Sequence, residues 1–247
     1  MSLTAEQVLG VWFSSPNFVA AEIAAGLGYR NAVLDIEHGS FDLAALDRFI
    51  PFSRSVGLTV MAKVLAPERS PIQQALDFGA SAVVIPHIQG AAHAREVAAY
   101  AKFPGLGTRS YAGGRTVQYQ GPDAEFFARE NSQILCLPMV ETPGALDEIE
   151  GILALPTVDG VFVGPSDLSL RRGRGRYARG AADWADLERI ALAAKAAGKP
   201  WYMPAWAPIE REVSKKLGVA AMICAMEHGA LYAGLEAAKK SLLSEQA

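Results

Sequence analysis

The stretch SPIQQALDFGASAVVIPHIQ, residues 70–89, contains a helix pattern followed at once by a strand pattern. Pro71 stands just inside the expected start of the helix and Gly79 follows its end, which is the usual asymmetry of helix termini. The next run, 81–86, is almost continuously apolar, as is typical of a parallel strand covered on both faces. This stretch therefore predicts one helix–strand unit of an α/β protein.

The same alternation continues along the chain. Eight apolar runs are expected as strands: 8–13, 31–37, 58–64, 81–86, 133–140, 159–164, 199–205 and 219–226. Helical patterns lie between them, among them 40–52 with a Ser or Asp cap, 90–103 and 183–199. This count and the length of 247 residues predict one TIM (β/α)8 barrel domain over 1–247. A doubly wound open sheet is the alternative, although it would normally have fewer strands or a second domain.

Composition narrows the function classes. The net charge of −3 disfavours a nucleic-acid-binding protein, which usually shows a dominant basic face. No run of about 18 apolar residues indicates a membrane span, and the N-terminal MSLTAEQVLG lacks the apolar core of a signal peptide. Cys136 and Cys224 lie inside apolar runs and are expected to be buried thiols. These features predict a cytoplasmic protein.

Two segments depart from the regular alternation. Segment 103–122 is glycine-rich and long for a loop without structure, which indicates a functional or interface segment. Segment 170–180, LRRGRGRYARG, is strongly basic. It is either a solvated loop, or it attracts an anionic substrate or meets an acidic patch on a neighbouring subunit.

In a TIM barrel the catalytic groups come from the C-terminal ends of the strands. Glu141 and Asp167 each follow an expected strand, and the two strands are neighbours. Carboxylates held close together repel unless a cation or a proton lies between them, and their oxygen ligands favour Mg²⁺ or Mn²⁺. The alternative is that Ser166 or Asp167 caps the helix that follows.

The second expected strand ends in Asp35, Glu37 and His38. His38 is a candidate general base that Asp35 would orient. The alternative is an ordinary polar strand end, and the sequence assigns no role to Glu37. The other polar residues at or near expected strand ends, without an assigned role, are His87, Gln89, Trp206, Glu227 and His228.

Lys63 ends the third expected strand. Its ammonium group is suited to binding a substrate carboxylate, and a lysine with a lowered pKa could instead form a Schiff base. The third possibility is a side chain that extends to solvent at the barrel rim.

At this point four stretches carry a family resemblance: LDIEHGSFD (34–42), PIQQALDFGASAVVIPHIQ (71–89), MVETPGALDEIEGILALPTVDGVFVGPSDLS (139–169) and AAMICAMEHGAL (220–231). The chain resembles the HpcH/HpaI aldolase/citrate lyase family, the class II pyruvate aldolases, over nearly its whole length. ETPGA and GPSDLS are the most specific parts of the resemblance.

The resemblance implies a metal enzyme without a Schiff base, using Mg²⁺, Mn²⁺ or Co²⁺. It implies that Glu141 and Asp167 bind the metal and that His38, supported by Asp35, is the base. The other implied active-site residues are Asp77, a further acid, and Gly164, Pro165 and Ser166, which hold the pyruvate carboxylate.

The implied reaction is reversible aldol cleavage of a 4-hydroxy-2-oxo acid, such as a dicarboxylate or a sugar acid, to pyruvate and an aldehyde. His38 would remove the proton of the 4-hydroxyl group, and Lys63 and the metal would stabilise the pyruvate enolate. The resemblance also implies catabolism of aromatic compounds or sugar acids, and a homohexamer built as a trimer of dimers. Its C-terminal helices, here 231–247, would be exchanged between subunits.

The chain departs from the family at three places. Lys63 stands where an arginine is common, Met139 where a glutamine often precedes the metal glutamate, and the loop after Asp167 is rich in arginine. Lysine keeps the charge but loses the two-pronged geometry of arginine. Three alternatives stay open: an acyl-CoA thioester lyase of the same superfamily, a Schiff-base aldolase that uses Lys63, and a barrel that binds ligands without catalysis.

Overall fold

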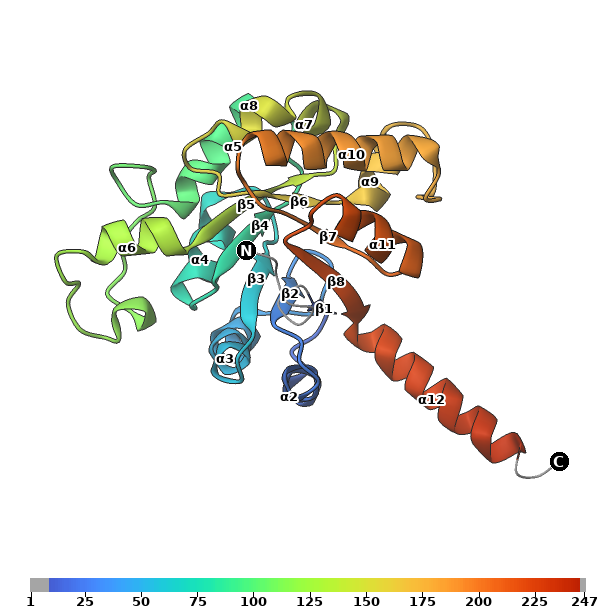
Figure 1. The fold of residues 1–247 in the computed structure, drawn as a ribbon. Helices are drawn as coiled ribbons and strands as arrows, with labels where there is room; N and C mark the ends of the chain where they lie inside the picture. Colours follow the sequence, from blue (N-terminus) through green and yellow to red (C-terminus); the bar gives the residue numbers. More distant parts are fainter. Residues whose placement is uncertain (1–8, 245–247) are drawn as a thin grey trace.

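The computed structural model describes residues 9–244, which form a closed barrel of eight parallel strands paired in chain order (Figure 1). The eightfold barrel is therefore confirmed, and the open sheet is excluded. Residues 1–8, on which the prediction about a signal peptide depends, lie outside the described part of the chain.

Each expected apolar run contains one strand. The strands are β1 (Leu9–Phe13), β2 (Asn31–Asp35), β3 (Thr59–Lys63), β4 (Ala82–Ile85), β5 (Leu135–Val140), β6 (Val161–Val163), β7 (Trp201–Pro204) and β8 (Ala221–Met226). The strands are shorter than the expected runs, which extend one or two residues beyond them at one end or at both. The register places Asp35 beside Lys63 at the C-terminal ends of β2 and β3.

Successive strand residues point alternately into the barrel and out towards the helices. One apolar cluster, which includes Val33, Met61, Leu137 and Phe162, fills the barrel. A second and larger cluster joins the outward residues, such as Leu34, to the surrounding helices. Because both faces of the strands are buried, the runs had to be continuously apolar, which is why the sequence reveals them.

Helices connect the strands. They are α2 (Phe18–Gly26), α3 (Leu43–Ser55), α4 (Arg69–Asp77), α5 (Ala91–Ala98), α6 (Phe126–Gln133), α7 (Pro143–Asp147), α8 (Ile149–Leu153), α9 (Pro165–Arg171), α10 (Ala181–Ala196), α11 (Pro208–Lys216) and α12 (Glu227–Ser244), with 3-10 turns η1 (Ala99–Ala101) and η2 (Arg115–Val117). The Asp42 side chain caps α3 by accepting a hydrogen bond of 2.7 Å from the Ala45 amide.

The glycine-rich segment 103–122 has little regular structure and is held against the helices by charged side chains. Arg109 donates to Asp77 on α4 at 2.8 Å, and Arg115 donates to Asp47 on α3 at 2.7 Å. Gln118 and Tyr119 have positive φ angles of 52° and 60°. These contacts hold the segment to the outer surface of the barrel, and its function stays a prediction.

Helix α12 leaves the barrel instead of covering it (Figure 1). Its exposed apolar side chains include Leu231, Tyr232, Leu235, Leu242 and Leu243. Within residues 9–244, no helix combines the length and the apolar character needed to cross a membrane. Both cysteines are free thiols; Cys136 is buried, which raises its pKa to about 12, and Cys224 is partly buried.

Candidate active site

Asp35 ends β2 in a buried position with several donors around it. The Trp12 indole donates to one carboxylate oxygen at 3.2 Å, and Lys63 Nζ lies 3.1 Å from the other. The backbone amide of His38 also donates to Asp35, at 3.2 Å. These contacts compensate the loss of hydration, and they fold the residues after β2 back over the mouth of the barrel.

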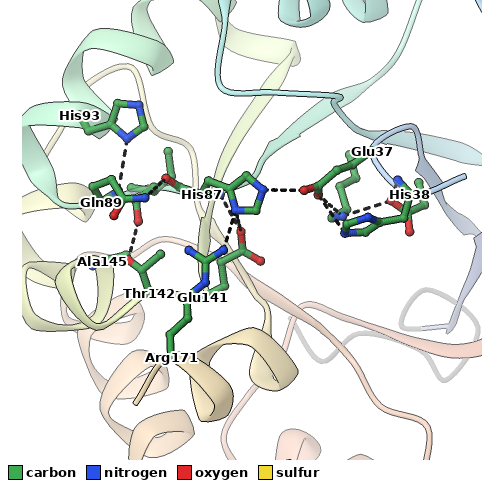
Figure 2. A network of polar contacts seen from close by, with 12 residues as sticks. Glu37, His38, His87, Gln89, His93, Glu141, Thr142, Ala145 and Arg171 are labelled. Atoms are coloured by element: carbon green, nitrogen blue, oxygen red, sulfur yellow. Dashed lines mark hydrogen bonds and ion pairs between the residues drawn. The ribbon is translucent and has the colours of Figure 1, made fainter. Parts of the chain in front are cut away.

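Glu37 contacts more of the polar side chains at the mouth than any of the predicted site residues (Figure 2). It accepts a short hydrogen bond from Lys63 Nζ, and its other oxygen lies 2.6 Å from His87 Nε2. His38 Nε2 lies 3.5 Å away. Burial alone would raise the pKa of Glu37, but the hydrogen bond and charge of Lys63, with the charges of His38 and His87, outweigh it and lower this pKa.

The structure changes the expected partnership of His38. Asp35 was expected to orient the imidazole ring, but it binds the backbone amide of His38, and the carboxylate beside the ring belongs to Glu37. The reason is that Asp35 is the last residue of β2 and points into the barrel like Val33, two residues before it. The His38 side chain is 67% exposed and is therefore open to a substrate.

Glu141 follows β5 and its side chain is only 3% exposed. One of its oxygens accepts a hydrogen bond of 2.6 Å from the His87 amide. The other faces Gly164, where a Cβ atom would lie 2.8 Å from it. Burial raises the pKa of Glu141 and the charge of Asp167 adds to this, while the hydrogen bond and charge of His87 and the charge of Lys63 oppose it.

Asp167 lies in the first turn of α9, after β6. The helix is capped by Gly164 without any side-chain hydrogen bond, so neither Ser166 nor Asp167 has the capping role that was the alternative. Across residues 9–244, no side chain or amide pairs with the Asp167 carboxylate.

The pair of acids fits a divalent cation. Glu141 is a buried carboxylate whose pKa is raised partly by Asp167, so a cation between them would relieve the repulsion. No group of three or more His, Cys, Asp or Glu residues suited to a metal exists among the described residues. Glu141 and Asp167 would therefore leave most coordination positions to water and substrate, as is common for Mg²⁺.

His87 and Arg171 lie among these polar side chains, although neither was predicted as a site residue. His87 follows β4 with a positive φ of 59°, a conformation that is uncommon outside glycine. Arg171 lies 2.9 Å from His87 Nδ1, and His87 Nε2 lies 2.6 Å from Glu37 on the other side of the ring. Polar contacts thus connect the ends of β2, β4 and β5 with α9 (Figure 2).

The remaining expected residues divide into two groups. Pro165, Ser166 and Asp167 line a cavity of about 440 Å³ together with Trp206. Asp77, by contrast, is not brought together with the other site residues, because it ends α4 and pairs with Arg109 there. Met139 points into the packed barrel interior below Gly164.

The two other expected strand-end residues at the last strand lie at the start of α12. Glu227 accepts a hydrogen bond of 3.2 Å from the Ser14 amide, and it therefore holds the start of α12 to the end of β1. His228 is exposed.

Comparison with known proteins identifies relatives of this chain. The 2-keto-3-deoxy-L-rhamnonate aldolase of Klebsiella pneumoniae subsp. pneumoniae is 32% identical over 173 residues, which cover 69% of this chain and 64% of that protein, less than two thirds of its length. The hydroxypyruvate/pyruvate aldolase of Roseovarius nubinhibens is 32% identical over 200 residues, covering 77% of this chain and 76% of that protein.

A solved structure of an HpcH/HpaI aldolase from Desulfitobacterium hafniense DCB-2 has the same fold, with a TM-score of 0.88 at 24% identity over 96% of this chain and 92% of that one. Residues 8–214 match the family described as HpcH/HpaI aldolase/citrate lyase. Because that match covers most of the barrel, including β2, β5 and β6 with their acidic ends, the chain belongs to the HpcH/HpaI aldolase/citrate lyase family.

Proposed function

We propose that this protein is a metal-dependent pyruvate aldolase, which cleaves a 4-hydroxy-2-oxo acid to pyruvate and an aldehyde and also catalyses the reverse addition. The observation that supports it best is the pair Glu141 and Asp167 at the ends of β5 and β6. The buried Glu141 has a raised pKa to which Asp167 contributes, and Asp167 has no pairing partner in residues 9–244. Aldolase names among the relatives agree with this proposal.

A divalent cation, Mg²⁺, Mn²⁺ or Co²⁺, held by these two acids would act as a Lewis acid that stabilises the negative charge developing on the pyruvate fragment. Gly164, Pro165 and Ser166 offer backbone and hydroxyl groups beside Asp167, where the carboxylate of the 2-oxo acid would bind. The Lys63 ammonium is buried at the end of β3, where its charge opposes the rise in the pKa of Glu141, and it adds a positive charge to the same region.

His38 is the proposed base that removes the proton of the 4-hydroxyl group when the C3–C4 bond breaks. Its ring is exposed at the mouth, and Glu37 lies beside Nε2 to stabilise the imidazolium that forms. Asp35 fixes the backbone of His38 rather than its ring. Lys63 is ill placed for a Schiff base, since its Nζ would have to leave both Asp35 and Glu37 to reach a carbonyl carbon.

The test uses pyruvate alone, so that it is independent of the aldehyde. Exchange of the pyruvate methyl protons in D₂O, followed by NMR, reports formation of the enolate. We expect exchange with Mg²⁺ or Mn²⁺, none after removal of metal with EDTA, and none in Glu141→Gln or Asp167→Asn. Exchange at an unchanged rate in metal-free protein, or a covalent pyruvate adduct trapped on Lys63 by borohydride, would contradict the proposal.

We also propose that α12 is exchanged between subunits of a homo-oligomer, as in a hexamer made of dimers. Its leucines are exposed, and the helix projects away from the barrel that residues 9–244 form (Figure 1). An apolar groove of about 360 Å³ lies between α2 and the start of α12, and its lining includes Val19, Ile23 and Leu27. A helix from a second subunit would cover this groove and lose its own exposed apolar surface.

A further inference from the structure

The basic segment 170–180, which comprises the end of α9 and the loop after it, contains five arginines, of which four have acidic or histidine partners. Arg174 contacts Asp183 at 3.1 Å and Asp186 at 2.6 Å. The other three paired arginines are Arg171 on His87, Arg172 on Asp186 and Arg179 on Glu210. Arg176 is the exception: its side chain is exposed and pairs with no group in the described part of the chain.

The loop that presents Arg176 is fixed on both sides. Before it, the ion pairs of Arg174 hold the loop to α10, and the Arg174 amide donates to the Ser169 carbonyl at 3.1 Å. After it, Arg179 contacts the fully buried Glu210 on α11 at 3.2 Å. Gly175 has a φ of 72°, which a residue with a side chain rarely adopts, and it makes the turn directly before Arg176.

Arg176 lines the same cavity of about 440 Å³ as Ser166, Asp167 and Trp206. The other charged groups on its wall are accounted for: Arg179 and Glu210 neutralise each other, and Asp167 is a proposed metal ligand. The cavity therefore extends from the proposed pyruvate and metal site to one positive charge without a counter-ion. A substrate whose 2-oxo end binds beside Asp167 would direct its aldehyde portion along this wall.

We propose that Arg176 binds an anionic group, carboxylate or phosphate, on the far end of the aldehyde portion, and so selects anionic over neutral aldehydes. The inference rests on the proposed aldolase function. The planar guanidinium group donates two parallel hydrogen bonds to either anion. The contact adds no covalent step: it positions the carbonyl carbon of the aldehyde against C3 of pyruvate.

The experiment compares matched aldehydes in the aldol addition to pyruvate. Succinate semialdehyde is paired with its neutral methyl ester, and glyceraldehyde 3-phosphate with glyceraldehyde. We expect the wild-type kcat/KM to be about tenfold higher for the anionic member of at least one pair. Arg176→Gln should remove this preference, Arg176→Lys should keep part of it, and neutral aldehydes should react as before. The pair that shows the preference identifies the anion.

A surface arginine on α10 provides the control, since Arg189→Gln changes the net charge equally at a distance from this cavity. A second readout does not require turnover. It is the change in tryptophan fluorescence, to which Trp206 in the cavity wall contributes, on titration with glycerol 3-phosphate or 4-hydroxybutyrate, and with glycerol as the neutral comparison. If the pyruvate exchange test fails, the aldolase proposal fails, and these titrations still decide the role of Arg176. Equal losses for charged and neutral aldehydes, or anion binding unchanged in Arg176→Gln, would overturn the inference.

Discussion

At the scale of single residues, Glu37 gives the clearest account of how the mouth of the barrel is organised. Its carboxylate is shared between Lys63, His87 and His38, so one acid sets the positions of three basic side chains. The low pKa of Glu37 keeps it charged, which suits an acid that stabilises a cationic imidazole. Glu141, with a raised pKa, is suited instead to binding a cation that replaces the proton.

Replacing His38 by alanine should lower the rate of aldol cleavage by about 100-fold, because the other imidazole beside Glu37, that of His87, is held between Glu37, Glu141 and Arg171. Metal affinity should remain, since His38 contacts neither metal acid in residues 9–244. Kinetics together with calorimetric titration of Mn²⁺ test both statements. His93→Ala, on α5, is the matched control; unchanged turnover in His38→Ala would remove His38 from the mechanism.

Metal affinity should depend on pH through Glu141. A proton competes with the metal for this carboxylate, and because its folded pKa is raised, protonation begins at a higher pH than for an ordinary glutamate. As the pH is lowered, affinity should therefore begin to fall while exposed glutamates, with an ordinary pKa of about 4.3, are still ionised. Calorimetric Mn²⁺ titration at several pH values measures it, and an affinity independent of pH above about 5 would contradict the prediction.

The stability of the metal-free protein should depend on pH in the opposite direction to the metal affinity: through Glu141, it should fall as the pH rises. Ionisation of Glu141 is less favourable in the folded than in the unfolded chain, so this group costs stability as the pH rises through its folded pKa. Bound metal should remove that cost. Thermal unfolding with and without Mn²⁺ should therefore show a difference that grows with pH.

At the scale of elements, the connection from β6 to α9 brings the two proposed metal acids together. Gly164 has no side chain, so the Glu141 side chain can lie directly against it. Asp167 follows in the first turn of α9. The strands themselves were predictable because both of their faces are buried. The contacts between their ends were not, since they depend on the turn after β2 and on the left-handed conformation of His87.

Gly164→Ala should weaken metal binding and lower activity about tenfold or more, because the added Cβ would lie 2.8 Å from both the Cβ and Oε2 atoms of Glu141 and 3.0 Å from Met139 Cε. Gly121→Ala is the control, since nothing lies within 4 Å of a Cβ at that position. Mn²⁺ titration and the exchange of pyruvate protons provide the measurements. Wild-type affinity in Gly164→Ala would show that the position of Glu141 is not constrained by this contact.

At the scale of the whole molecule, the barrel is closed by hydrogen bonds but incompletely covered. Helix α12 projects from the end of β8 with Leu231 and Leu235 exposed, while the groove beside α2 stays open. The proposed exchange of α12 between subunits would cover both apolar surfaces together.

Leu235→Glu should therefore shift the protein to smaller assemblies, because a charge would enter the apolar contact between subunits; burial of one leucine contributes about 2 kcal/mol at each such contact. Light scattering after size-exclusion chromatography measures the mass. Leu192→Glu introduces the same charge at another exposed leucine, on α10, and should leave the mass unchanged. The same mass for both variants would disprove the proposed exchange.

The sequence by itself determined the barrel and the two acids after β5 and β6, because burial on both faces demands continuous apolar runs and a charged residue directly after such a run must lie at the mouth. Only the tertiary structure decided that Glu37 rather than Asp35 lies beside the His38 ring, that Asp77 pairs with Arg109 away from these residues, and that Arg176 alone of five neighbouring arginines lacks a partner in residues 9–244. The physical reason is that these contacts form between side chains on separate strands and loops. The spacing of residues along the chain does not specify which of those side chains come into contact.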